Sequence, residues 1–197
     1  MILYLHGFRS SPQSFKARLL AARLAELGRG DEWSCPMLPA SPFEAMALAE
    51  REVARRLCGR DMDAGNANIA VIGSSLGGYF ATHLAEKHGW RAVLLNPVVA
   101  PQRDLNLSPA GEQRLWQGNG SPAVEPRHLD ELRALGIEAI TRPERYYLIV
   151  ASGDEVLDYH KALAHYAGVR TRVLDGADHA LSGFPDYVDD VLAFCDA

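Results

Sequence analysis

The sequence predicts an α/β protein in which a mostly parallel sheet of about six strands carries helices on both faces. Short apolar segments typical of buried strands alternate with longer segments that have the spacing of amphipathic helices. Such alternation predicts βαβ units, which place helices on both sides of a parallel sheet. A chain of 197 residues is long enough for one sizeable core, so we expect a single domain over residues 1–197.

Six segments have the composition of strands. Most are compact runs of β-branched, aromatic and other apolar residues, which is typical of strands buried on both faces. The expected strands are residues 2–5, 33–38, 69–73, 91–96, 146–151 and 169–174, of which the second is the weakest and the last alternates as an edge strand does.

Helices are expected between these strands. Apolar residues recur at helical spacing over residues 15–27, and Gly28 ends that pattern. Ser41, Pro42 and Glu44 form a helix start, with a serine N-cap, proline at the first position and a glutamate that reaches back. The other expected helices cover residues 42–58, 79–88, 159–166 and 185–194.

The segment from residue 97 to residue 144 has a different composition. It is rich in proline, glycine and polar residues, with only two modest helical patches, at residues 110–116 and 127–135. One interpretation is a lid or cap inserted over the carboxyl edge of the sheet. Ordinary connecting helices are an equally good interpretation.

Composition and charge argue against some partners and locations of the protein. A net charge of −5 and scattered basic residues argue against a nucleic-acid partner. No apolar run approaches the length that spans a bilayer, and the chain opens without a secretory signal, so we expect a cytoplasmic protein. Cys35, Cys58 and Cys195 are odd in number and lack metal-ligand spacing, which predicts reduced thiols.

Residues 73–77, Gly-Ser-Ser-Leu-Gly, match the pattern Gly-x-Ser-x-Gly between an expected strand and an expected helix. This is the context of a nucleophile elbow, a sharp turn that exposes a serine at the carboxyl end of a sheet. Gly73 and Gly77 leave room for the strand and helix to pass closely. We therefore expect Ser75 to be the nucleophile, with the amide of Leu76 at the helix start ready to meet an oxyanion.

A glycine-rich turn that only packs, or one that binds phosphate, is the alternative interpretation. A phosphate-binding Walker loop needs Lys followed by Ser or Thr after its last glycine, whereas Tyr79 follows Gly78. The dinucleotide pattern Gly-x-Gly-x-x-Gly is also absent, so phosphate binding is disfavoured.

An acidic residue and a histidine follow two later strands. Asp154 comes just after residues 146–151, and His179 lies in the loop after the last strand. The order serine, acid, histidine is the order found in α/β-hydrolases. His179 would take the proton of the Ser75 hydroxyl and return it to the leaving group, while Asp154 would orient the imidazole. This chemistry needs no metal or organic cofactor.

Two of these assignments have rivals. Asp158 is a second candidate for the acid, although Asp154 follows the strand more directly. His6 is a second histidine near the expected site, but it stands too early in the chain order and should shape a loop. That loop, His6-Gly7-Phe8, matches the His-Gly start of the oxyanion loop of esterases, and the amide of Phe8 is the expected second donor.

Seven motifs spread along the chain form a pattern more specific than the elbow alone. They are residues 4–8, 10–12, 73–79, 96–97, 153–159, 178–179 and 183–184. With these motifs the sequence resembles the YqiA-type esterase family, small bacterial α/β-hydrolases, over nearly its whole length. The resemblance implies an α/β-hydrolase fold with a trimmed sheet that begins at the His-Gly strand. It also implies hydrolysis of carboxylic esters or thioesters, with acyl-CoA-like and short acyl ester substrates.

Two classes of function follow from these patterns. The first is a serine esterase or thioesterase that acts through an acyl-Ser75 intermediate on a small-molecule substrate. The second is a hydrolase-fold module that keeps the site only to bind an acyl ligand. No triad position is visibly broken, which favours the enzyme. Arg9 and Arg103 are candidates by position for contacts with an acyl-CoA substrate.

Overall fold

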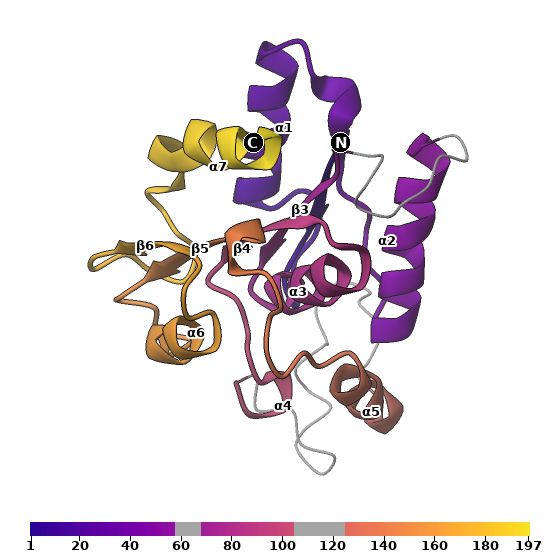
Figure 1. Cartoon of the computed structure of the whole chain (residues 1–197), viewed down its shortest axis with the longest axis vertical. Coiled ribbons are helices and arrows are strands. Elements are labelled where there is room, and N and C mark those ends of the chain that lie inside the picture. The colour runs from indigo at the N-terminus through magenta and orange to yellow at the C-terminus, as the bar shows by residue number, and fades with distance from the viewer. Residues whose placement is uncertain (58–67, 105–124) are drawn as a thin grey trace.

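The computed structural model describes residues 1–57, 68–104 and 125–197. Its strands form one sheet in the order β2-β1-β3-β4-β5-β6, and every neighbouring pair is parallel (Figure 1). The strands are β1 Ile2–Leu5, β2 Trp33–Ser34, β3 Ala70–Ser74, β4 Arg91–Leu95, β5 Tyr146–Ala151 and β6 Arg170–Leu174. The predicted α/β class and the six-stranded sheet are confirmed, and β6 is an edge strand as expected.

The helices alternate with the strands. They are α1 Phe15–Glu26, α2 Pro42–Leu57, α3 Leu76–His88, α4 Pro101–Asp104, α5 Pro126–Ala134, α6 Tyr159–His165 and α7 Val188–Asp196. Short 3₁₀ turns cover Gly30–Glu32, Pro143–Arg145 and Phe184–Tyr187. The last helix therefore begins as a 3₁₀ turn and becomes α-helical only at Val188.

One strand is shorter than predicted. The segment expected to pair over residues 33–38 pairs only at Trp33 and Ser34. Pro36 has no N–H to donate to a strand ladder, which explains why this edge strand ends early. The helical patch expected at residues 110–116 lies outside the described residues, and the lid interpretation of residues 97–144 stays a prediction.

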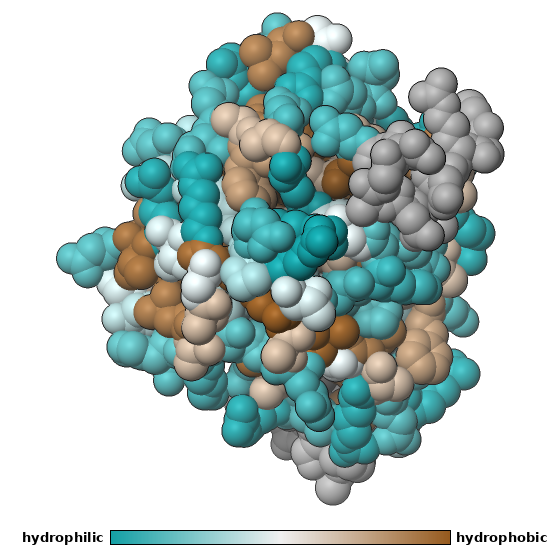
Figure 2. Space-filling view, in the orientation of Figure 1, coloured by the Kyte–Doolittle hydropathy of each residue, from teal (hydrophilic) through white to brown (hydrophobic). Residues whose placement is uncertain are grey.

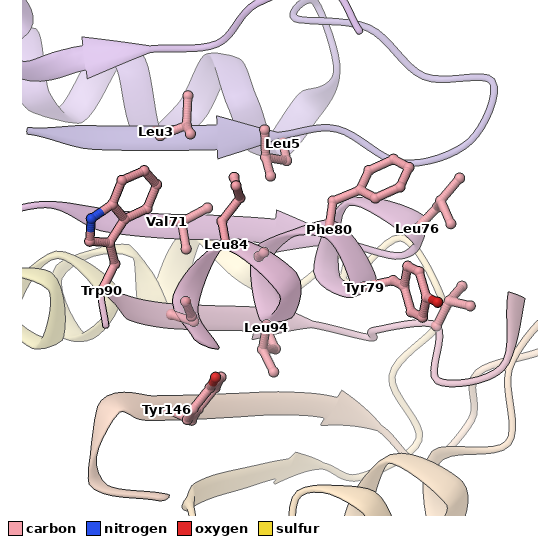
Figure 3. Close-up of a cluster of buried hydrophobic side chains, with 14 of the residues drawn as sticks. Leu3, Leu5, Val71, Leu76, Tyr79, Phe80, Leu84, Trp90, Leu94 and Tyr146 are labelled. Atoms are coloured by element: carbon pink, nitrogen blue, oxygen red, sulfur yellow. The ribbon is translucent and has the colours of Figure 1, made fainter. Parts of the chain in front are cut away.

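The sheet is covered on both faces. Helices α1 and α7 pack on one face, whereas α2, α3 and α6 pack on the other (Figure 1). Side chains of β1 alternate between the two faces. Ile2 and Tyr4 belong to the apolar cluster under α1 and α7, whereas Leu3 and Leu5 belong to the cluster under α2, α3 and α6. Figure 3 shows the cluster under α2, α3 and α6, where side chains of α3 meet those of the central strands.

The large exposed apolar side chains come from different elements of the structure. Figure 2 shows one face of the molecule as largely hydrophilic, with hydrophobic patches between. The large exposed apolar residues come from different elements and loops: Phe15, Leu27, Met37, Phe43, Val156 and Val173. In the part of the chain that the structure describes, no helix combines the length and apolar character that crossing a membrane requires.

The thiols that the structure describes are free. Cys35 is half-buried and Cys195 is buried, and neither is in a disulfide. Burial raises the pKa of each thiol to about 12, so both stay protonated at neutral pH. Cys58 lies outside the described residues.

Candidate active site

The turn that the sequence predicts as a nucleophile elbow lies between β3 and α3. Ser75 has φ 56° and ψ −122°, a conformation that a residue with a side chain adopts only at a cost. Its N–H donates to the carbonyl of Leu95 in β4 at 3.0 Å. Its carbonyl accepts from Gly78 at 2.9 Å and from Val98 at 3.1 Å. The strained turn is therefore held by the neighbouring strand and by the chain that follows it.

The glycines of the elbow are required by close packing. A Cβ on Gly73 would lie 2.1 Å from the carbonyl oxygen of Gly77, and a Cβ on Gly77 would lie 1.9 Å from that of Leu5. Gly78 is similarly crowded, since its Cβ would lie 2.7 Å from Cβ of Pro97. These contacts join α3 to β1, to β3 and to the chain just after β4, which fixes the serine relative to the sheet edge.

The loop after β1 lies against the serine. A Cβ on Gly7 would lie 3.1 Å from Cβ of Ser75 and 3.6 Å from its Oγ. Phe8 follows in this loop, and Leu76 is the first residue of α3. The two residues whose amides were expected to bind an oxyanion therefore flank Ser75 from two elements.

His6 fixes this loop and is not placed to act as the base. Its Nδ1 donates to the carbonyl of Gly7 at 3.1 Å, and its Nε2 accepts from the N–H of Leu38 at 3.1 Å. Burial lowers the pKa of His6, although the bond to Gly7 opposes this, so the ring stays neutral. Both ring nitrogens are used to tie two loops together.

Asp154 and His179 form a hydrogen-bonded pair after β5 and β6. Nδ1 of His179 lies 2.7 Å from Oδ2 of Asp154. The other carboxylate oxygen accepts from the N–H groups of Val156 and Leu157, both at 2.8 Å. The Asp154 side chain is 1% exposed and that of His179 is 23% exposed. The carboxylate is thus inaccessible, while the imidazole still reaches the surface.

The surroundings of Asp154 keep it ionised. Burial by itself would raise its pKa, but the hydrogen bonds from His179, Leu157 and Val156 outweigh burial and lower the pKa below its usual value. A carboxylate beside Nδ1 keeps the proton on that nitrogen, so Nε2 is the ring nitrogen left to exchange a proton. Within the described residues, the imidazole and the Ser75 hydroxyl are not hydrogen bonded to each other.

The rival acid has another role. Asp158 is the N-cap of α6, where its carboxylate accepts from the N–H of His160 at 3.0 Å. It also contacts the ring of His160 at 3.0 Å. The hydrogen bonds of Asp158 therefore serve the start of a helix, and the carboxylate that meets His179 belongs to Asp154.

Three side chains that were not among the expected site residues hold the histidine loop. Asn96 and Lys16 donate to its backbone carbonyls, and Glu155 accepts the N–H of His179 at 3.0 Å. Asn96 directly follows an expected central strand and belongs to one of the motifs of the family resemblance, but neither signal assigned it a role in the site. Lys16 lies on an amphipathic helix, where a lysine is normally expected to face solvent.

A small apolar cavity of about 40 Å³ opens beside the serine. It is lined by residues of the loop after β1, of the segment before α2, and of α3 and α5: His6, Gly7, Phe8, Leu38, Pro39, Ala40, Pro42, Leu76, Phe80, His128 and Leu132. Leu132 also lines a larger cavity of about 470 Å³ between α4 and α5, which includes Arg103 and Arg133. Leu132 is therefore a lining residue of both cavities.

In residues 1–57, 68–104 and 125–197, no three His, Cys, Asp or Glu side chains are grouped closely enough to hold a metal ion.

Comparisons with known proteins agree with this architecture. The model of a family described as an uncharacterised protein family, UPF0227, matches residues 1–196. A structure of the metagenome-derived lipolytic enzymes LipS and LipT is 18% identical, covers 98% of this chain and 92% of that chain, and has a TM-score of 0.70.

Two further solved structures have the same arrangement. Est1E from Butyrivibrio proteoclasticus with ferulic acid bound is 14% identical, with 98% of this chain and 87% of that chain covered and a TM-score of 0.63. An α/β superfamily hydrolase from Oenococcus oeni PSU-1 is 16% identical, with 100% and 92% covered and a TM-score of 0.60. At these identities the likeness establishes the α/β-hydrolase fold.

Proposed function

Because this chain belongs to UPF0227, the YqiA-type family of small bacterial esterases, we propose that it is a serine hydrolase of carboxylic esters or thioesters. Its substrates carry short acyl groups, and Ser75, Asp154 and His179 are its catalytic residues. The observation that carries the proposal is the pair of Asp154 and His179, joined at 2.7 Å at the sheet edge where Ser75 occupies its strained turn.

The first half-reaction transfers the acyl group to the enzyme. Oγ of Ser75 attacks the carbonyl carbon of the substrate while Nε2 of His179 accepts the hydroxyl proton. The amides of Phe8 and Leu76 donate hydrogen bonds to the oxyanion that develops. When the tetrahedral intermediate collapses, the leaving alkoxide or thiolate takes the proton from His179, and the acyl group remains on Ser75.

The second half-reaction regenerates the serine. Water attacks the acyl carbonyl as His179 accepts one of its protons, and the carboxylic acid leaves when that proton returns to Oγ. Asp154 stabilises the imidazolium in both steps through its bond to Nδ1. Because the carboxylate is itself held by two backbone N–H groups, it keeps its orientation while the ring changes charge.

The small cavity supports a short acyl group. A volume of about 40 Å³ accommodates about three water-sized groups. Gly7, Phe8 and Leu76 line this cavity and also belong to or adjoin the expected oxyanion site, which supports the cavity as the site of the acyl group.

A fluorophosphonate probe tests the assignment of the nucleophile. We expect the wild-type protein and Ser74→Ala to be labelled, and Ser75→Ala to remain unlabelled. Ser74 is a matched control, because it is the adjacent serine and is buried at the end of β3. Equal labelling of Ser75→Ala and wild type would show that another residue is the nucleophile.

A substrate series then tests the chemistry. p-Nitrophenyl esters and acyl-CoA thioesters with acyl groups of two to twelve carbons should be compared at equal concentration. We expect the highest kcat/KM for the shortest acyl groups, with turnover abolished in Ser75→Ala. Binding of acyl compounds without turnover of any ester or thioester would indicate a binding module instead.

A further inference from the structure

The loop that carries His179 is held by side chains from distant parts of the chain. Residues 178–180 lie outside the helices and strands; the carbonyl of Asp178 accepts the N–H of Leu181 at 3.0 Å, and side chains from elsewhere donate to all three carbonyls. Nδ2 of Asn96 donates to the carbonyl of Asp178 at 3.3 Å and to that of His179 at 3.1 Å. Nζ of Lys16 donates to the carbonyl of Ala180 at 2.7 Å. Three consecutive carbonyls are therefore bound by two side chains.

Asn96 also joins this loop to the sheet. It directly follows β4 and has φ 43°, a conformation that asparagine tolerates better than most residues. Its Oδ1 accepts the N–H of Ala151, at the end of β5, at 2.8 Å. The same buried amide thus links the end of the strand that precedes Asp154 to the backbone of His179.

Lys16 reaches the loop from α1 and is itself buried. Burial lowers its pKa to about 8, and the carboxylates of Asp178 and Asp154 only partly oppose this. A buried ammonium whose hydrogen bond goes to a carbonyl is costly compared with an apolar side chain of the same length. Stability is therefore a poor explanation for a lysine at this position.

We propose that Asn96 and Lys16 are positioning residues that hold the His179 loop so that the imidazole stays bonded to Asp154 at the sheet edge that carries Ser75. Neither side chain touches the reacting atoms, and each acts through the backbone of residues 178–180. The inference rests on the proposed function for its catalytic consequence. The contacts themselves can be tested without any assay of activity.

Substitutions can remove the donors and leave the rest of each side chain in place. Asn96→Asp keeps the acceptor for Ala151 and the tolerance of a positive φ, but it has no N–H to give to the loop. Lys16→Met keeps the length of the chain and removes the ammonium, whereas Lys16→Arg retains a donor. Arg18→Met is the matched control, because Arg18 is an exposed cation on the same helix.

The kinetic readout separates positioning from general stability. For Asn96→Asp and Lys16→Met we expect kcat per titrated active site to fall about 10- to 100-fold, with KM changed less than about twofold. Lys16→Arg should recover most of the lost kcat, and Arg18→Met should match the wild type. If kcat per titrated site stays at the wild-type value in both variants, the positioning role is wrong.

Hydrogen exchange provides the readout that does not depend on activity. Amides of residues 177–182 should exchange at least about tenfold faster in Asn96→Asp and Lys16→Met, while amides of β3 keep their protection. Unchanged exchange in the loop of both variants would overturn the inference, whatever the activity. Absence of labelling and turnover in the wild type would instead overturn the proposed function, and loop exchange would still decide whether these residues hold the loop.

Discussion

Gly77 in α3 and Leu5 at the end of β1 are in backbone contact, so close that a Cβ on Gly77 would lie 1.9 Å from the carbonyl oxygen of Leu5. The start of α3 therefore rests directly on the strand that leads into the His6–Phe8 loop. This contact explains how a loop early in the chain comes to lie beside Ser75. The proposed oxyanion site depends on it.

Gly77→Ala should disrupt this contact severely. The added methyl group overlaps backbone atoms, which cannot move aside as a flexible side chain could, so we expect the free energy of unfolding to fall by more than about 3 kcal/mol. Urea denaturation measures the change. Gly183→Ala is the control, since Gly183 has φ −83° and a Cβ there would meet nothing within 4 Å. A stable Gly77→Ala protein would mean that α3 is not held against β1.

The backbone strain at Ser75 should be measurable as stability. Strain of this kind costs about 1–3 kcal/mol, and glycine relieves it because it has no Cβ. Glycine also loses more conformational entropy on folding, which offsets part of this gain. We therefore expect Ser75→Gly to be more stable than Ser75→Ala by about 1 kcal/mol. Thermal and urea unfolding of the two inactive variants provide the comparison. Equal stability would argue that the turn is relaxed.

Asp154→Asn should abolish most of the activity while leaving the fold intact. An amide in place of the carboxylate no longer fixes the proton on Nδ1 of His179, so we expect kcat to fall about 10³- to 10⁴-fold. Asp158→Asn is the matched control, because asparagine is also a good N-cap for α6. Steady-state kinetics on a short acyl ester distinguishes the two. A larger loss in Asp158→Asn would reassign the acid.

The burial of Lys16 predicts a particular dependence of stability on pH. Its pKa is about 8 in the folded protein and 10.5 in the unfolded reference, despite the nearby carboxylates of Asp154 and Asp178. Between these values the unfolded chain binds a proton that the folded chain lacks, so the free energy of unfolding rises with pH. Relative to Lys16→Met, the wild type should gain up to about 3 kcal/mol from pH 7.5 to pH 10.5. Urea denaturation at several pH values tests this, and a constant difference would contradict it.

Leu132 should control the length of acyl chain that the small cavity accepts. Truncation to alanine opens the space of about 40 Å³ toward the neighbouring cavity of about 470 Å³. We expect Leu132→Ala to shift the highest kcat/KM from acyl groups of two or three carbons to those of six or more. Leu129→Ala is the control, because Leu129 is buried on the same helix and lines neither cavity. An unchanged chain-length profile would place the acyl site elsewhere.

Local sequence patterns were sufficient to predict much of the fold. β1 and β5 have the bounds expected from their apolar runs, because a strand buried on both faces needs apolar side chains on each side. The edge strand β2 was harder to predict, since its length depends on which backbone groups find a partner in β1. Pairing of that kind cannot be predicted from the composition of the strand itself.

Sequence order alone also brought Ser75, Asp154 and His179 to one edge, because parallel strands all end on the same side of the sheet. Tertiary structure decided which carboxylate meets the imidazole: Asp154 turns toward His179, while Asp158, four residues later, caps α6. It also decided that Lys16 is buried and bound to the carbonyl of Ala180, 164 residues away. Such contacts depend on how whole helices and strands pack, so they cannot be predicted from the local periodicity of the sequence.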